Sequence, residues 1–147
     1  MANLVTEKEK GYYEKFNLIV EEIRLKQLRI LVIDDDDGFR KSLCFKLKRK
    51  FNAQVEDVNS GILGIDKLKT GNQYDLILTD IMMPEMTGIE TYYEIRKIDS
   101  EIKIAVMSAY SSSEEWKKAQ ELKDVTLLHK PFSDEDLIRV ISNDEVN

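Results

Sequence analysis

Short apolar runs alternate with longer segments of helical periodicity from about Leu28 to the C-terminus. Most of the runs are apolar nearly throughout, which is typical of strands buried on both faces of a sheet; the second run is weaker. They predict five strands, at Arg29–Ile33, Gln54–Val58, Asp75–Thr79, Lys103–Met107 and Val125–Leu128.

Between and after these runs, apolar residues recur at helical spacing in five segments. We expect helices at Phe39–Phe51 and through Ile62–Leu68, Ile89–Ile95, Trp116–Leu122 and Leu137–Ile141. Because strands and helices alternate strictly, the strands should be parallel and joined by right-handed crossovers, with helices on both faces. The pattern predicts an α/β fold with a doubly wound five-stranded parallel sheet. Ser112-x-x-Glu115 and Ser133-x-x-Asp136 predict the caps of the last two helices.

The first 27 residues differ from this alternation. Tyr12, Phe16, Ile19 and Ile23 recur at the spacing of one helix face, and Gly11 suggests that the helix begins near Tyr12. The apolar repeat lasts less than two heptads, which is too short for an independent coiled coil. We therefore interpret residues 1–27 as a helical extension that packs on its own domain or forms a linker, and residues 28–147 as that domain. A dimerisation or partner helix is the alternative.

Composition excludes several classes of protein. A chain of 147 residues with 42% hydrophobic residues can bury one core. The net charge of −6 and the pI of about 5.0 argue against a nucleic-acid-binding surface. No apolar stretch approaches the roughly 20 residues that span a bilayer, and no signal peptide is recognisable. The single cysteine, Cys44, fits a reducing compartment, so we expect a cytoplasmic protein.

Polar residues of complementary chemistry follow four of the predicted strands. Asp34 and Asp35 follow the first strand, Asp80 the third, Ser108 the fourth and Lys130 the fifth. The carboxyl ends of parallel strands share one edge of the sheet, where ligands bind in such folds. Carboxylates crowded together ionise only when a cation joins them. This set therefore predicts a site for a divalent metal and a phosphoryl group.

These residues also carry a resemblance to a known family. From Leu28 onward the chain resembles the receiver domain of two-component response regulators. The motifs that carry the resemblance occur in order, as Ile30–Asp36, Asp75–Pro84, Met86-x-Gly88, Val106–Tyr110 and Lys130-Pro131-Phe132. The resemblance implies a flavodoxin-like sheet with strand order 2-1-3-4-5 and five helices.

The resemblance also implies a metal site. Asp34, Asp35 and Asp80 would bind Mg²⁺, and the backbone carbonyl of Met82 would complete the protein ligands. Mg²⁺ prefers octahedral oxygen coordination and keeps several waters, so these few ligands suffice.

By the same resemblance, Asp80 would accept a phosphoryl group from a histidine kinase or a histidine phosphotransfer protein. Lys130 would neutralise one phosphoryl oxygen and Ser108 would donate a hydrogen bond to another. The Lys130–Pro131 bond is expected to be cis. Such a domain is a signalling switch rather than a turnover enzyme, and it acts by changing its contacts with a downstream protein.

Some positions depart from the family pattern. Leu127 stands where receivers commonly carry a tyrosine or phenylalanine that couples phosphate to the surface. Tyr110 could shield the phosphoryl group or replace part of that function. Thr87 stands where aspartate is frequent, which we expect to change loop detail alone. For His129 we expect a structural role, while Trp116 fits either helix packing or a partner anchor.

The predicted helix Phe39–Phe51 is rich in basic residues and contains no acidic one. The basic residues are Arg40, Lys41, Lys46, Lys48, Arg49 and Lys50. A solvated helix face is the simpler interpretation. In receivers this helix is a common docking face for the histidine-bearing partner, so the second hypothesis is contact with an acidic partner surface.

Other functions and assemblies stay open at this point. One is a phosphorylation-independent scaffold that uses the receiver fold, which Leu127 keeps open. Another is a haloacid-dehalogenase-like phosphatase. Asp35-x-Asp37-Gly38 resembles the first motif of those enzymes, although Phe39 replaces the usual threonine. A dimer could form through the N-terminal helix or through the fourth and fifth helices of the receiver-like part. About 17 residues follow Lys130, so we expect no output domain in this chain.

Overall fold

The computed structural model describes residues 4–143. Five parallel strands form one sheet in the order β2-β1-β3-β4-β5, as expected. The strands are β1 Arg29–Ile33, β2 Gln54–Val58, β3 Leu76–Asp80, β4 Lys103–Ser108 and β5 Val125–His129. The helices are α1 Glu7–Lys26, α2 Asp37–Phe51, α3 Gly61–Lys69, α4 Gly88–Ile98, α5 Glu114–Gln120 and α6 Asp134–Ser142. None of the helices in residues 4–143 has the length and apolar character of a membrane span.

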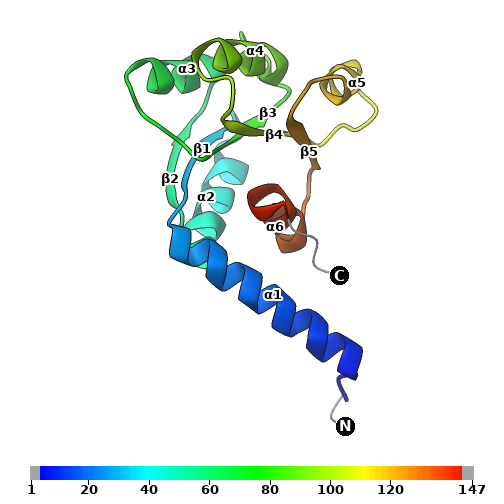
Figure 1. Ribbon diagram of the computed structural model, residues 1–147. Coiled ribbons are helices and arrows are strands. Elements are labelled where there is room, and N and C mark those ends of the chain that lie inside the picture. The colour runs from blue at the N-terminus through cyan, green and yellow to red at the C-terminus, as the bar shows by residue number, and fades with distance from the viewer. Residues whose placement is uncertain (1–3, 144–147) are drawn as a thin grey trace.

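Helices cover both faces of the sheet (Figure 1), and a hydrophobic core lies on each face. Successive residues of a strand point to opposite faces, so β1 divides its apolar side chains between the cores. Ile30 and Val32 pack with buried residues of α1, α2 and α6, whereas Leu31 and Ile33 pack with those of α3, α4 and α5. This division explains why β1, β3 and β4 are apolar nearly throughout, since both faces of these central strands are covered.

The register of the strands brings the predicted polar residues to one edge of the sheet. Asp80 pairs with Met107 of β4, and Ser108 pairs with His129 of β5. Lys130 follows β5 directly, and its backbone N–H donates to the carbonyl of Ser108 at 2.8 Å. The carboxyl ends of these strands therefore lie side by side.

The N-terminal helix begins earlier than its glycine suggested. The helix α1 begins at Glu7, where Thr6 and Glu9 form a capping box, and not near Tyr12. A capping box satisfies two free backbone donors, which offsets the propensity cost of Gly11 four residues later. The space around Gly11 is open, so packing does not require glycine there.

The same helix packs on its own domain. Ile19, Val20 and Ile23 are buried in the core that α1 shares with α2 and α6. Arg24 donates to the last carbonyls of α2, and the Tyr12 hydroxyl donates to Glu135 of α6 at 2.6 Å. The described residues of α1 thus match the interpretation of a helix packed on its own domain. Figure 1 shows α1 crossing the outer side of α2 and α6.

Two other predictions of helix limits were wrong. The cap of α5 is Ser113, whose Oγ accepts from the Trp116 N–H, and not Ser112. This helix ends at Gln120, so Leu122 lies beyond it and still packs against the core. Ser133 and Asp136 form the predicted cap of α6 as a full capping box.

Candidate functional site

A polar cavity of about 310 Å³ lies at the carboxyl edge of the sheet. Every residue predicted for the site lines it, and so do four neighbours. The predicted residues are Asp34, Asp35, Asp80, Met82, Ser108 and Lys130. The neighbours are Asp36, Phe39, Ala109 and Tyr110. The structure therefore brings together residues that are up to 96 positions apart in the sequence, as for Asp34 and Lys130.

Three carboxylates converge in this cavity. Asp34, Asp35 and Asp80 each offer one oxygen, and the three oxygens lie within 4.8 Å of one another. Asp34 is fully buried and Asp80 is 7% exposed, whereas Asp35 is exposed. Burial raises the pKa of Asp80 to about 6, and the negative charge of Asp34 adds to this increase. Crowding and burial both disfavour the ionised form, so a cation in this place would relieve a real electrostatic cost.

Lys130 joins two of these carboxylates. Its Nζ lies 2.7 Å from Asp34 Oδ2 and 3.3 Å from Asp80 Oδ1. The ammonium also lies 3.9 Å from the centre of the Phe39 ring, which limits its access to solvent. The charge of Lys130 lowers the pKa of Asp80, against the effect of burial. The ammonium thus lies in the cavity between two carboxylates. The Lys130–Pro131 bond is cis, as the resemblance implied.

Ser108 lies at the end of β4 and is almost fully buried. Its Oγ accepts a hydrogen bond from the backbone N–H of Tyr110 at 3.0 Å. A hydroxyl that accepts such a bond keeps one O–H donor. Ser108 is therefore oriented by the backbone and is able to donate to an oxygen that enters the cavity.

The backbone around Asp80 is held closely. Ile81 N–H donates to Met107 O at 3.0 Å, and Gly88 N–H donates to Ile81 O at 2.8 Å. A Cβ on Gly88 would lie 2.2 Å from the carbonyl oxygen of Asp80, so only glycine allows this close approach. Thr87 caps α4 by accepting from the Glu90 N–H. The start of α4 thus supports the backbone that carries Asp80.

The prediction that placed Arg40 on an exposed basic face was wrong. Its guanidinium is buried and contacts Asp37, Asp57 and the backbone carbonyl of Asp34. The spacing of Asp37 and Arg40, three residues apart on one helix, was a signal for the first contact. The contact with Asp57 depends on the pairing of β1 with β2, which no local pattern reveals.

Residues that depart from the family pattern lie beside the site. Leu127 is half-buried in β5, and Tyr110 is exposed at the rim of the cavity. The Trp116 ring packs against the core and meets the exposed His129 edge-on, with 6.2 Å between ring centres. These contacts bury part of the Trp116 side chain, as helix packing would. Whether Tyr110 shields a phosphoryl group stays a prediction.

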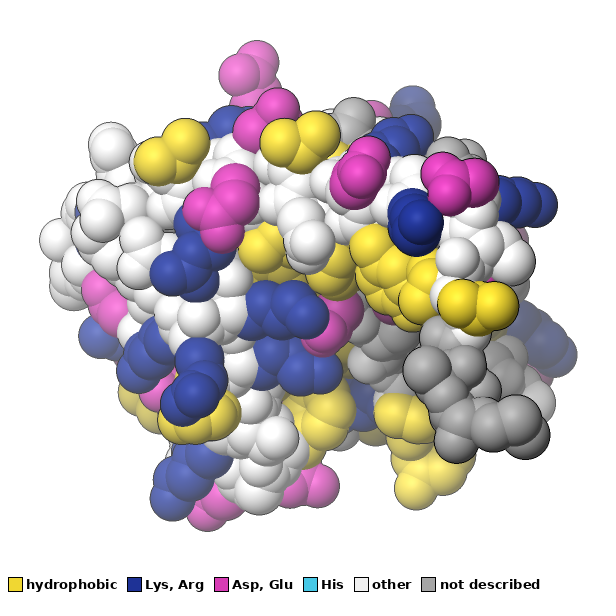
Figure 2. All heavy atoms as spheres, turned by 90° about the horizontal axis from the view of Figure 1, so that it is seen from below, with side chains coloured by type: hydrophobic (Ala, Val, Ile, Leu, Met, Phe, Trp, Pro, Cys, Tyr) yellow, Lys and Arg dark blue, Asp and Glu magenta, His cyan; other side chains and the backbone are white. Residues whose placement is uncertain are grey.

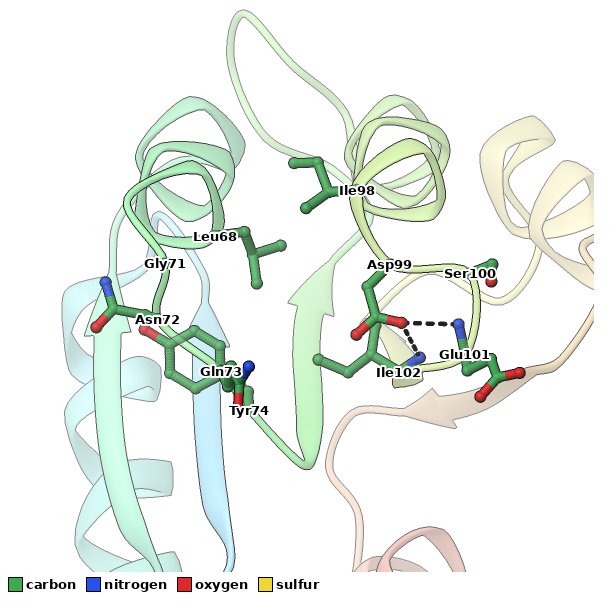
Figure 3. A pocket seen from close by; sticks show the side chains of 10 residues that line it. All are labelled: Leu68, Gly71, Asn72, Gln73, Tyr74, Ile98, Asp99, Ser100, Glu101 and Ile102. Atoms are coloured by element: carbon green, nitrogen blue, oxygen red, sulfur yellow. Dashed lines mark hydrogen bonds between the residues drawn. The ribbon is translucent and has the colours of Figure 1, made fainter.

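A second cavity, of about 450 Å³, lies at the end of the sheet where the strands begin (Figure 3). It lies between the turns that precede β3 and β4, and its lining includes Leu68, Tyr74 and Ile98. Its Asp99 carboxylate accepts from the backbone N–H groups of Glu101 and Ile102, so it closes its own turn. The charged groups in Figure 3 do not converge on the cavity as those at the carboxyl edge do.

The donor set at the carboxyl edge fits Mg²⁺. Hard divalent cations take oxygen ligands, and Mg²⁺ needs only one or two carboxylates beside its waters. Two buried carboxylates, one exposed carboxylate and a polar cavity meet this requirement. Met82, whose backbone carbonyl was the predicted fourth ligand, lines the same cavity.

Known proteins share this sequence pattern. The response regulator receiver domain family matches residues 30–142. The response regulator receiver protein CpdR of Brucella abortus is 32% identical over 113 residues, which cover 77% of this chain and 92% of CpdR. Sporulation initiation phosphotransferase F of Bacillus subtilis is 32% identical over 104 residues, which cover 71% of this chain and 82% of that protein. This chain spans a smaller share of larger relatives. The match covers 47% of the CpxR homolog of Haemophilus influenzae and 24% of ZraR of Klebsiella oxytoca.

Solved structures show the same fold. The response regulator protein TrrA of Thermotoga maritima, solved in complex with Mg(2+)-BeF, is 29% identical with a TM-score of 0.68. The similarity covers 79% of this chain and 97% of that one. A response regulator receiver protein of Sinorhizobium medicae is 27% identical with a TM-score of 0.69, over 81% of this chain and 94% of that one. Together with the motifs and the cavity, these matches show that the chain belongs to the response regulator receiver family, whose members are signalling domains.

Proposed function

We propose that this chain is a phosphorylation-dependent switch that accepts a phosphoryl group on Asp80 in a Mg²⁺-dependent reaction. The observation that carries the proposal is the convergence of Asp80 with Asp34, Asp35, Ser108 and Lys130 in one cavity. With a pKa of about 6, Asp80 is mostly ionised near neutral pH and is available as a nucleophile.

Phosphoryl transfer depends on position and on charge neutralisation more than on strong nucleophiles. A carboxylate oxygen of Asp80 attacks the phosphorus of a phosphohistidine, and the P–N bond breaks as the P–O bond forms. Lys130 neutralises one phosphoryl oxygen, and the Ser108 hydroxyl donates to another. Bound Mg²⁺ supplies further charge neutralisation and orientation, and Asp34 and Asp35 would hold it together with Asp80 and the Met82 carbonyl.

The response to phosphorylation follows from the contacts of Lys130 and Ser108. The new dianion attracts both side chains, which lie at the ends of β4 and β5. The loops that follow these strands lead to α5 and α6, so their surface packing changes. A downstream protein would read that change, and water would later hydrolyse the acyl phosphate.

Acetyl phosphate treatment followed by intact mass measurement tests the proposal. One phosphoryl group should be added to the wild-type chain with Mg²⁺, and none without Mg²⁺ or in Asp80→Asn. The exposed helix residue Asp66 provides a matched control, because Asp66→Asn should be labelled like the wild type. Labelling of Asp80→Asn, or of the wild type without metal, would contradict the proposal. Repeated turnover of p-nitrophenyl phosphate would favour a phosphatase, and no labelling at all would favour a scaffold.

The exposed face of α2 is the proposed docking surface for the phosphodonor. Lys41, Lys48 and Arg49 are exposed on it, with Phe45 64% exposed among them. The Arg49 guanidinium lies 5.9 Å from the centre of the Phe45 ring. Figure 2 shows several Lys and Arg side chains close together on one face of the molecule. An apolar anchor within a basic surface suits an acidic partner.

Charge reversal tests this surface. Lys41→Glu with Lys48→Glu should slow transfer from the cognate donor by roughly tenfold, because steering is lost. Acetyl phosphate is small and needs no docking surface, so its reaction should be spared. Lys117→Glu with Lys118→Glu, on the exposed side of α5, is the matched control. Equal losses with both donors would rule out docking on α2.

A further inference from the structure

Arg40 is a buried guanidinium behind the metal-binding acids, and the reaction proposed above leaves it without a role. We infer that Arg40 is a positioning residue that fixes the backbone of the acidic run Asp34–Asp37 for metal binding. It acts through Asp34 and does not itself contact the reacting atoms. The inference rests on the proposed Mg²⁺ site and adds a residue to it.

Three contacts from one guanidinium support this role. Nη1 donates to the backbone carbonyl of Asp34 at 2.8 Å, and Nη2 lies 2.7 Å from Asp37 Oδ1. Nε donates to Asp57 Oδ2 at 2.7 Å, and Asp57 belongs to β2. The Arg40 side chain is only 10% exposed. A single planar group therefore joins the first residue of the acidic run, its last residue and the neighbouring strand.

The acidic run needs such support. Asp34, Asp35, Asp36 and Asp37 follow one another, and their charges repel. Asp36 caps α2 by accepting from the Phe39 N–H, and its own N–H donates to Asp34 Oδ1 at 2.9 Å. These local bonds orient the middle of the run. Arg40 ties its two ends, so Asp34 and Asp35 keep the positions at which their oxygens meet that of Asp80.

The role depends on the shape of the side chain as well as its charge. A guanidinium donates in several fixed directions, whereas a lysine ammonium is a flexible point charge. Arg40→Lys would keep the positive charge but could not reproduce three bonds to separate elements. If Arg40 acted by charge alone, that variant would behave like the wild type. Groups that orient metal ligands typically contribute 10- to 100-fold to metal affinity.

Calorimetric titration with Mg²⁺ alone tests the inference without any phosphodonor. Arg40→Lys should weaken Mg²⁺ binding by roughly tenfold, and Asp57→Ala, which removes the acceptor of the Arg40 Nε hydrogen bond, should weaken it as well. Arg96→Lys is the matched control, because Arg96 donates to the carbonyls of Ile102 and Asp124 at the opposite edge of the sheet. Its Mg²⁺ affinity should equal that of the wild type. With acetyl phosphate, Arg40→Lys should label slowly at low Mg²⁺ and normally at saturating Mg²⁺.

The possible results separate this inference from the proposed function. Unchanged Mg²⁺ affinity in Arg40→Lys would overturn the inference, as would an equal loss in Arg96→Lys, which would indicate a general loss of stability. If Arg40→Lys does not fold, Asp57→Ala alone decides, because it keeps Arg40 and removes the acceptor of the Nε hydrogen bond. A wild-type chain that binds no Mg²⁺ would refute the proposed metal site itself, and the inference with it.

Discussion

Asp80 is the residue at which function and stability oppose each other. Its carboxyl group is buried beside Asp34, and Lys130 offsets this only in part. The pKa is raised from 3.8 to about 6, so the folded protein binds this proton more tightly than the unfolded chain does. The ionised carboxylate that the proposed reaction requires is therefore maintained at the expense of folding stability.

A pH dependence follows for Asp80→Asn without metal. Below about pH 4 the Asp80 carboxyl group is protonated in the folded and in the unfolded protein, so its burial does not lower the free energy of unfolding through ionisation there. As pH rises from about 4 to 6, the carboxyl group of the unfolded chain ionises more readily than that of the folded protein, which lowers the free energy of unfolding. This loss of stability persists above that range. Asp80→Asn should therefore raise the free energy of unfolding near neutral pH by about 3 kcal/mol and have less effect near pH 4.

Urea unfolding at several pH values, without Mg²⁺, measures this difference. Asp66→Asn, on an exposed turn of α3, should show no such pH-dependent gain. An Asp80→Asn variant that is less stable than the wild type near neutral pH would show that the carboxylate is not strained there.

At this scale the sequence predicted which residues meet but not how they pair. The positions of Asp34, Asp80, Ser108 and Lys130 after apolar runs were enough to place them at one edge. The pairing of Lys130 with Asp34 at 2.7 Å, closer than its contact with Asp80, depends on side-chain packing around Phe39. No pattern in the sequence encodes such a distance.

At the scale of elements, helix limits were harder to predict than helix existence. A capping box and a glycine make opposing contributions of about 1 kcal/mol each at the start of α1, so local preference alone did not decide. The burial of Ile19, Val20 and Ile23 further along the helix adds the deciding stabilisation. Before α5, Ser111, Ser112 and Ser113 have the same capping side chain, so residue type alone does not identify Ser113 as the cap.

Helix α4 supports the backbone of Asp80, the proposed phosphoacceptor, through Gly88. Gly88→Ala places a Cβ 2.2 Å from the Asp80 carbonyl oxygen and 2.8 Å from Ile81 Cα, and neither backbone atom yields easily. We expect a loss of about 1–3 kcal/mol in stability from this overlap. Because Asp80 must shift, labelling by acetyl phosphate should slow by tenfold or more even where the protein stays folded.

Gly11→Ala is the matched control for Gly88→Ala. A Cβ at Gly11 meets nothing within 4 Å, and Gly11 lies inside α1. This variant should be more stable by about 0.5–1 kcal/mol and should be labelled normally. Normal labelling of Gly88→Ala would mean that the start of α4 does not position Asp80.

At the scale of the whole molecule, the order of the strands was predicted without an alternative, whereas the place of α1 was predicted with one left open. Strict alternation of strands and helices indicated a parallel sheet, and the resemblance to receiver domains implied the strand order that the structure shows. The stripe Tyr12, Phe16, Ile19 and Ile23 favoured packing on the chain's own domain and left a partner helix as the alternative, because a helix face does not reveal what covers it. The structure shows α1 sharing one core with α2, α6 and the sheet.

This shared core predicts that α1 unfolds together with the rest of the protein. Ile23 is 1% exposed, and Ile23→Ala should lower the free energy of unfolding by about 2–4 kcal/mol. Loss of helical signal and the change in fluorescence of Trp116, which lies on the opposite face of the sheet, should shift to the same lower urea concentration. Leu18→Ala is the control on the same helix, since Leu18 is 66% exposed and its loss should change stability by less than about 0.5 kcal/mol. If Ile23→Ala melts part of the helical signal while the Trp116 transition stays in place, α1 is a separate unit, and its buried face is available to other partners.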